Sequence, residues 1–262
     1  EPYWNSPINA GRPGWHVEDT AITEKYLGIQ YDIHGGARDL IFPHHEAEIA
    51  QMESLTKKPL VKYWMHTGFL NVNHEKMSKS LGNFITIKDA LKKHSPETLR
   101  MFYISTHYRS PIDFNENNLK QAKSNLDKIK NFLINIEYKN GKKDITLLLK
   151  RLKQEFIKNM DDDFNTPKAL ACIFIFINKV NKLNINKKSA KNILKFFLEI
   201  DKIFNIIKLE GSIPDEITKL AQEREKARNN KEWNKSDELR NKIKSKGYLV
   251  EDTSSGYIIK RI

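Results

Sequence analysis

The sequence has very little cysteine and lacks long apolar runs. Cys172 is the single cysteine among 262 residues, which excludes a disulfide-stabilised fold and favours a reducing compartment such as the cytoplasm. No stretch of about 18 apolar residues occurs, so no membrane partner or membrane-spanning helix is expected. The chain starts with Glu-Pro-Tyr-Trp and shows no charged-then-apolar leader, so we expect no targeting peptide and interpret the chain as a piece of a longer polypeptide.

The charge is unevenly distributed along the chain. The 45 basic and 33 acidic residues give a net charge of +12, and residues 119–210 hold 20 basic against 10 acidic side chains. Such an excess favours a polyanionic partner, above all nucleic acid, because each neutralised phosphate releases condensed counterions. Taken alone, the excess is explained equally well by solvated helix faces rich in lysine.

Two different patterns divide the chain. Residues 15–110 alternate short apolar strands with helices, which predicts part of an α/β sheet. From Leu119 to Ile136 apolar residues recur every three or four positions, which predicts a helix with one buried face. Further helices of an antiparallel bundle are predicted over residues 147–157, 167–183 and 190–208. Beyond residue 214, two charged helices and two β-rich runs predict a small α/β unit, in which we expect Trp233 to be buried.

The run Lys-Met-Ser-Lys-Ser at residues 76–80 carries two ammonium groups and two hydroxyls, with Gly68 and Gly82 as possible hinges. A loop of this kind can close over a triphosphate and stabilise the charge that develops when pyrophosphate leaves. Without further context, a solvated basic turn is the commoner interpretation.

The run Pro-His-His-Glu-Ala-Glu at residues 43–48 has the spacing of a metal site. If a helix starts at the proline, His44 and Glu48 lie four residues apart on one face and can share an ion. His45 and the glutamate after it resemble the start of a zinc-protease motif, but Ile49 stands where that motif needs histidine, which excludes the protease. By itself, such a pair is more often a surface pair than a metal site.

Longer runs carry a family resemblance. GRPGWHVED, DIHGGARDLIFPHHEAEIAQ and WMHTGFLNVNHEKMSKSLGNF resemble the second half of the catalytic domain of cysteinyl-tRNA synthetases. STHYRSPIDF, MDDDFNTPKAL and AQEREKARNNKEW resemble later parts of the same family, so the resemblance spans nearly the whole chain in order.

The resemblance implies an α/β fold followed by helices. It implies the second half of a Rossmann-like class I catalytic domain with its KMSKS loop at residues 1–84 and a stem-contact connection at 85–118. A tRNA-binding helical bundle would follow at 119–210, and a small α/β anticodon-reading region at 211–262.

The resemblance also implies an activity and its residues. The intact family enzyme activates cysteine with ATP, accompanied by Mg²⁺, and transfers it to tRNA(Cys) in the cytoplasm. Lys79 would contact the ATP phosphates with Lys76 assisting. Asp39 would meet the ATP ribose, although an acid stabilising a helix N-terminus is an equal alternative. Trp15 would form a wall of the amino-acid pocket, and His34 and His66 either line that pocket or are interior histidines.

The family binds Zn²⁺ at positions that correspond to His44 and Glu48, and a thiophilic ion there distinguishes cysteine from serine. Asp19 stands where the family has a cysteine ligand. The metal set is therefore either Asp19, His44, Glu48 and a ligand from elsewhere, or a site that has lost zinc or takes another ion.

Parts of the family enzyme do not occur in these residues. The H-I-G-H element and a second cysteine ligand, both from the N-terminal half of the catalytic domain, are missing, so we expect the chain alone to be inactive without that half. Two rival functions remain. One is a tRNA-binding piece without catalysis. The other is a paralogous ligase that joins cysteine to an amine, against which the helical bundle and terminal region argue.

Overall fold

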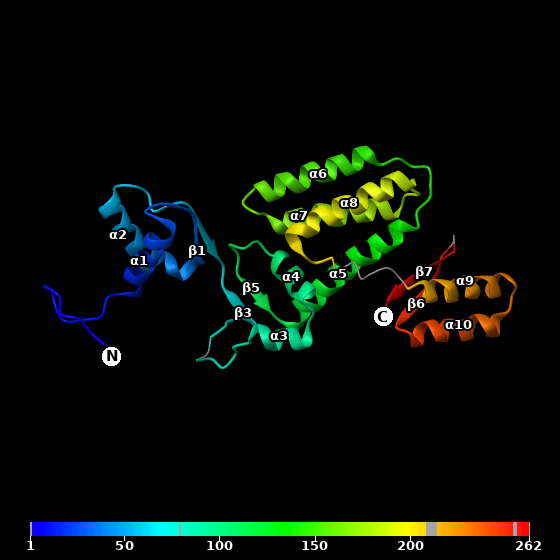
Figure 1. Cartoon of the computed structure of the whole chain (residues 1–262), viewed down its shortest axis with the longest axis horizontal. Coiled ribbons are helices and arrows are strands. Elements are labelled where there is room, and N and C mark those ends of the chain that lie inside the picture. Colours follow the sequence, from blue (N-terminus) through cyan, green and yellow to red (C-terminus); the bar gives the residue numbers. More distant parts are fainter. Residues whose placement is uncertain (1, 79, 208–213, 254–255, 262) are drawn as a thin grey trace. The chain divides into compact units, whose positions relative to one another are not determined.

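The computed structural model describes residues 2–78, 80–207, 214–253 and 256–261. These residues form two compact units (Figure 1): Glu1–Thr86 with Thr106–Glu116, and Ile87–Ser105 with Asn117–Ile262. Lys79, predicted to contact phosphates, lies outside the described residues.

A small parallel sheet organises the first unit. In chain order its elements are α1 (Trp15–Leu27), β1 (Tyr31–Ala37), η1 (Arg38–Leu40), η2 (Ile41–His45), α2 (Glu46–Thr56), β2 (Val61–Thr67), β3 (Leu70–Val72), β4 (Glu75–Lys76) and β5 (Ile112–Phe114). β1 and β2 pair in parallel, with Tyr31 opposite Val61, and α2 forms the crossover that parallel pairing requires. Buried Met52, Leu60 and Val61 pack together between helix and sheet. The turns η1 and η2 follow directly after the end of β1 and connect it to α2.

A second sheet brings distant segments together within this unit. β3 pairs antiparallel with β4 and parallel with β5, which lies about forty residues later in the chain. The backbone is very close here: a Cβ on Gly68 would lie 2.2 Å from the carbonyl oxygen of Ser110. Gly68 also donates its N–H to the carbonyl of Tyr108 at 2.8 Å. Only glycine fits at position 68, and the residues after β2 are thereby fixed beside β5.

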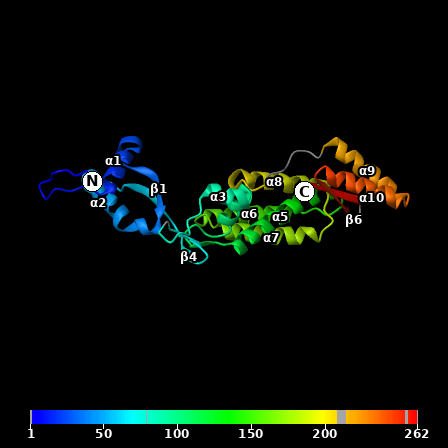
Figure 2. The same ribbon diagram turned by 90° about the horizontal axis from the view of Figure 1, so that it is seen from below.

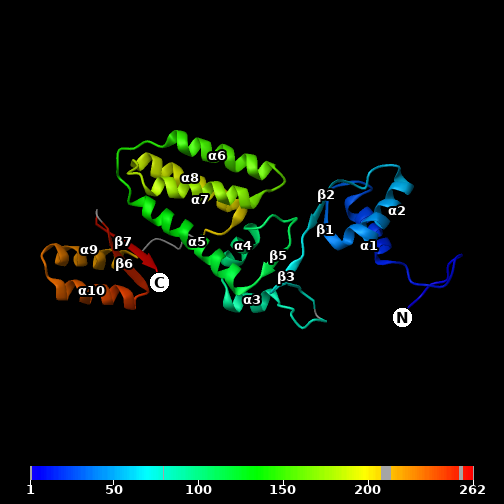
Figure 3. The same ribbon diagram turned by 180° about the vertical axis from the view of Figure 1, so that it is seen from behind.

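Helices dominate the second unit. They are α3 (Ile87–Lys93), α4 (Pro96–Ile104), α5 (Glu116–Glu137), α6 (Thr146–Asp161), α7 (Thr166–Asn181), α8 (Lys187–Phe204), α9 (Asp215–Asn229) and α10 (Trp233–Ser245), followed by β6 (Tyr248–Thr253) and β7 (Gly256–Arg261). α5 to α8 lie side by side in all three views (Figures 1, 2 and 3). Edge-to-face aromatic contacts join them, such as Phe132 with Phe176 and Phe156 with Phe196. Their stripes of apolar residues at helical spacing explain why these segments form a bundle.

The end of the chain forms a helix pair and a hairpin. β6 and β7 are antiparallel, and Ile217 and Ala221 of α9 pack with Ile243 of α10 against the hairpin. The buried guanidinium of Arg224 donates two hydrogen bonds to Asp252, at 2.7 and 2.9 Å. The prediction that Trp233 is buried was wrong.

Trp233 is 57% exposed because it is the first residue of α10, whereas the apolar cluster is formed by the later part of that helix, at Leu239 and Ile243.

The predicted fold class is confirmed: an α/β first part, a helical bundle and a small terminal α/β unit occur in that order. The predicted helix over 167–183 corresponds to α7, and Pro167 lies in its first turn, as expected from proline's fixed φ. In the part of the chain that is described, no helix has both the length and the hydrophobicity needed to cross a bilayer.

Candidate metal and nucleotide site

Asp19, His44 and Glu48 converge in the first unit. Asp19 comes from the middle of α1, and Glu48 lies in the first turn of α2. His44 lies between them in sequence, near the end of η2, the turn that leads from β1 to α2. His44 Nε2 is 3.1 Å from Asp19 Oδ2 and 3.4 Å from Glu48 Oε1. One nitrogen and two carboxylate oxygens thus face each other, which is a donor set for a divalent cation.

Trp15 holds the histidine of this group from one side. Its indole stacks on the ring of His44 with centroids 3.6 Å apart and planes at 11°. Trp15 and Asp19 lie four residues apart on α1 and so share one face of that helix. The stack fixes the ring plane of His44, while the indole itself remains 56% exposed and available to a ligand.

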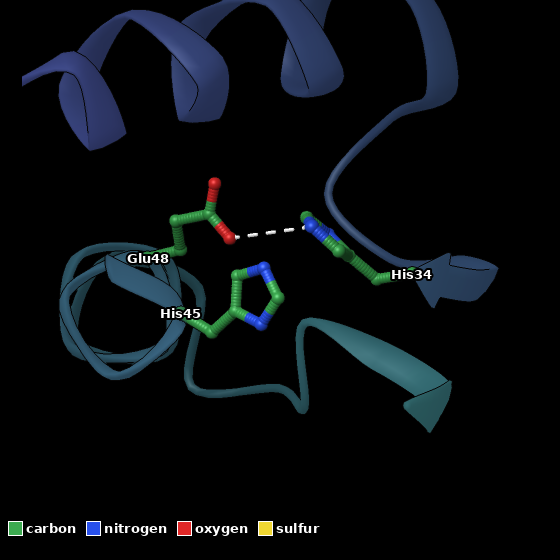
Figure 4. A group of neighbouring side chains, drawn as sticks. All are labelled: His34, His45 and Glu48. Atoms are coloured by element: carbon green, nitrogen blue, oxygen red, sulfur yellow. Dashed lines mark ion pairs between the residues drawn. The ribbon is translucent and has the colours of Figure 1, made fainter. Parts of the chain in front are cut away.

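A second group shares Glu48. His34 Nε2, from the middle of β1, is 3.5 Å from Glu48 Oε2, and the ring of His45 lies beside both (Figure 4). The other ring nitrogens are held: His34 Nδ1 bonds to the hydroxyl of Tyr31 at 2.5 Å, and His45 Nδ1 shares a hydrogen bond with His66 Nε2 at 2.8 Å. His34 and His66 are thus part of one network with the predicted metal residues.

Burial shapes the charges of both groups. Desolvation, and then the negative charge of Asp19, raise the pKa of Glu48 to about 7. Burial, and then the neighbouring His34, lower the pKa of His45 to about 4, and burial likewise lowers the pKa of His34. Near neutral pH these two imidazoles are uncharged, which is the form that binds metal ions.

Lys76 lies against Asp39 at the other end of the same strand-to-helix connection. Lys76 Nζ donates a hydrogen bond to Asp39 Oδ2 at 3.2 Å and lies over the ring of Phe69 at 4.4 Å from its centroid. The loop after Lys76 is closed by Asn83, whose side chain accepts from Ser78 N at 2.8 Å and donates to Lys76 O at 3.2 Å. The structure therefore pairs Lys76, predicted to assist at the ATP phosphates, with Asp39, predicted to meet the ATP ribose; these two roles stay predictions.

The sequence signalled the first of these two side-chain groups but not the second. His44 and Glu48 were recognisable from their i, i+4 spacing, whereas His34 and His45 come from different elements eleven residues apart. The available signal was the strand-end Gly-Gly after His34, because glycines at such a junction allow a helix to approach closely.

Comparison with known proteins identifies the class. Residues 1–124 match the family described as "tRNA synthetases class I (C) catalytic domain", and residues 155–209 match the DALR domain. LeuRS of Agrobacterium radiobacter K84, solved with tRNA and LeuAMS, superposes over 77% of this chain and 32% of its own with a TM-score of 0.57 at 14% identity, which shows the fold alone. These matches place residues 1–124 in the family of class I aminoacyl-tRNA synthetase catalytic domains.

Within that class, the relatives narrow the assignment. Residues 210–256 match the "Cysteinyl-tRNA ligase anticodon binding domain". Cysteine–tRNA ligases of Thermodesulfovibrio yellowstonii and Methanococcus maripaludis are 43% and 44% identical over 96% and 100% of this chain, and over 58% and 60% of their own length. The chain belongs to the cysteinyl-tRNA synthetase family, and it spans about 60% of the length of these curated relatives.

Proposed function

We propose that this chain supplies the KMSKS side of the active site and the tRNA-binding regions of a cysteine–tRNA ligase, whose remaining catalytic half comes from residues outside this chain. The observation that carries the proposal is the convergence of Asp19, His44 and Glu48 beneath Trp15 in the unit that also pairs Lys76 with Asp39. The reaction is the activation of cysteine by ATP with release of pyrophosphate, followed by transfer to tRNA(Cys), and we place it in the cytoplasm.

The ATP side of the proposal rests on charge. Lys76 and Lys79 would stabilise the phosphates as the cysteine carboxylate attacks the α-phosphate, with Mg²⁺ accompanying ATP. Asp39 would accept hydrogen bonds from the ribose. Because Asp39 and Lys76 are now paired with each other, ATP would have to separate them, freeing the ammonium group for a phosphate.

The amino-acid side rests on the first metal group. The residues fit a divalent cation, because the buried imidazole of His44 faces two carboxylates and its Nδ1 has no hydrogen-bond partner among the described residues. Asp19, His44 and Glu48 would hold the ion, which we propose to be Zn²⁺, and a bound zinc ion would bind the substrate thiol as a thiolate. Trp15 would then be the apolar wall of the pocket.

The tRNA side rests on the charge of residues 119–210. We assign residues 85–118 to the acceptor stem, 119–210 to tRNA binding and 211–262 to the anticodon. The excess of basic over acidic residues in the bundle fits contacts with phosphates, whose binding should weaken steeply with salt.

Cysteine-dependent exchange of pyrophosphate into ATP tests the enzyme proposal. We expect exchange when an N-terminal catalytic half from a relative is added, and none with this chain alone. With that half present, Lys79→Met and Lys76→Met should each lower exchange about 100-fold. Lys62→Met is the matched control, because Lys62 pairs with Asp32 on the exposed surface of the same unit and should leave exchange unchanged.

Two other results would redirect the assignment. Salt-dependent tRNA binding without exchange under both conditions would establish a tRNA-binding piece without catalysis. Transfer of cysteine to a small amine without any tRNA requirement would establish the paralogous ligase.

The metal is tested by elemental analysis after reconstitution with zinc. His44→Gln should remove the ion from the first group. Asp19→Cys should raise zinc affinity, because a thiolate is a softer and stronger donor to zinc than a carboxylate. Equal zinc affinity in the aspartate and cysteine forms would refute ligation at position 19.

A further inference from the structure

Glu48 presents its two oxygens to two different sets of side chains. Oε1 faces His44 at 3.4 Å, while Oε2 faces His34 at 3.5 Å. The side chain is only 2% exposed, and Oε2 has no hydrogen-bond partner among the described residues. A buried carboxylate oxygen left in this state is costly unless a cation or a hydrogen-bond donor reaches it.

The two histidines beside Oε2 are held in orientations suited to a metal ion. Tyr31 fixes His34 through Nδ1, and His66 fixes His45 through Nδ1, so Nε2 of each imidazole is left for another partner. In Figure 4 a ring nitrogen of His45 points toward the space between Glu48 and His34. Metal-binding histidines are oriented in this way, by a partner on the nitrogen that does not bind the ion.

The backbone leaves room on this side. A Cβ on Gly36 would lie 2.7 Å from His45 Cε1 and 3.0 Å from His45 Nε2. The absence of a side chain at position 36 is therefore what allows His45 to lie against β1 with Nε2 toward Glu48.

We propose that His34, His45 and Glu48 form a second divalent-metal site, adjacent to the group of Asp19 and His44, with Glu48 bridging the two. The proposal rests in part on the proposed function, because both sites use Glu48. Two imidazole nitrogens and one carboxylate form a set that binds zinc and leaves a coordination position open for a further ligand. The same set takes Co²⁺, which serves as a spectroscopic probe.

Metal counting on the whole chain tests the proposal. The metal-free protein is equilibrated with Co²⁺, bound ions are counted by elemental analysis, and visible absorption is recorded for each ion. We expect two ions in the unmodified chain. His34→Gln should remove one of them, Asp19→Asn should remove or weaken the other, and Glu48→Gln should affect both.

A milder variant covers the case in which a buried substitution disturbs folding. Tyr31→Phe removes only the hydroxyl that orients His34, and it should weaken the second ion about tenfold or more with helix content unchanged by circular dichroism. Lys62→Met on the neighbouring strand is the matched control and should change neither ion.

Other outcomes are decisive in the same way. The second site does not exist if Asp19→Asn removes every bound ion while His34→Gln and Tyr31→Phe both bind cobalt like the unmodified chain. A single ion lost in both Asp19→Asn and His34→Gln would mean one shared site and would also overturn the proposal. If Asp19→Asn changes nothing while His34→Gln removes the ion, the second site stands and the metal part of the proposed function fails.

Discussion

Replacing Gly36 with alanine should destabilise the first unit, whereas the same change at Gly35 should not. The two glycines are neighbours on β1, yet a Cβ at position 36 would lie 2.7 Å from a ring carbon of His45, while at position 35 the nearest atom is 3.7 Å away. The pair therefore separates a steric effect from any general effect of alanine in this strand.

The magnitude follows from how His45 is held. To reach a 3.4 Å contact its ring must retreat by about 0.7 Å. The side chain of His45 is 3% exposed, and its Nδ1 is held by a 2.8 Å hydrogen bond with His66 Nε2. Overpacking of this kind costs about 1–3 kcal/mol. Gly35→Ala should be neutral or slightly stabilising, because alanine restricts the unfolded chain.

Hydrogen exchange followed by mass spectrometry gives the local readout. For peptides that cover β1 and β2, a cost of about 2 kcal/mol corresponds to roughly thirtyfold faster exchange in Gly36→Ala. Peptides from α5 to α8 should exchange as before. If Gly36→Ala and Gly35→Ala show the same protection, then His45 does not lie against β1 as described, and the geometric argument for the second metal site fails with it.

The remaining predictions concern the second unit. Phe197→Ala should lower the free energy of unfolding by about 3–5 kcal/mol in a thermal melt, because Phe197 is buried in the bundle. Leu198→Ala, at a half-exposed position beside it, should lower it much less. Equal losses of stability would contradict the assigned helix face. Arg224→Met should cost about 2 kcal/mol, because Asp252 loses its bidentate partner but keeps ion pairs with Arg228 and Arg240 at 3.1 and 3.3 Å; urea unfolding followed by Trp233 fluorescence is the measurement. Hydrogen bonds from Arg224 lower the pKa of Asp252. The stabilisation from this pair should therefore be complete above the ordinary carboxyl pKa near 3.8 and should disappear as the pH falls through the lowered value. An acid-unfolding profile that Arg224→Met leaves unchanged would disprove the link.

Local patterns predicted much of this fold. The spacing of apolar residues from Leu119 to Ile136 corresponds to α5, because a helix that packs on one side needs that period and nothing distant in sequence. The hairpin at the end of the chain was predictable for the same reason, since its two strands and their turn are neighbours in sequence.

Tertiary proximity was harder to predict. His34 and His45 meet because the chain turns at the end of β1, and their spacing follows neither the helix nor the strand period. Trp233 has apolar residues on its helical face, yet the hairpin covers only the later part of α10, so the pattern predicted a burial that packing does not provide. His44 and Glu48 were named from their spacing and Asp19 from the family resemblance, and the convergence of all three became visible only in three dimensions.

The parallel pairing of β3 with β5 has a consequence for any attempt to divide the protein. The first unit is built from two separate stretches of chain, and residues 87–105 leave it and return. A truncation at residue 86 would remove the parallel neighbour of β3 and leave an unpaired edge on that strand. A shortened protein intended to isolate the first unit should therefore extend through residue 116, with the intervening helices either retained or replaced by a linker that reconnects the two stretches.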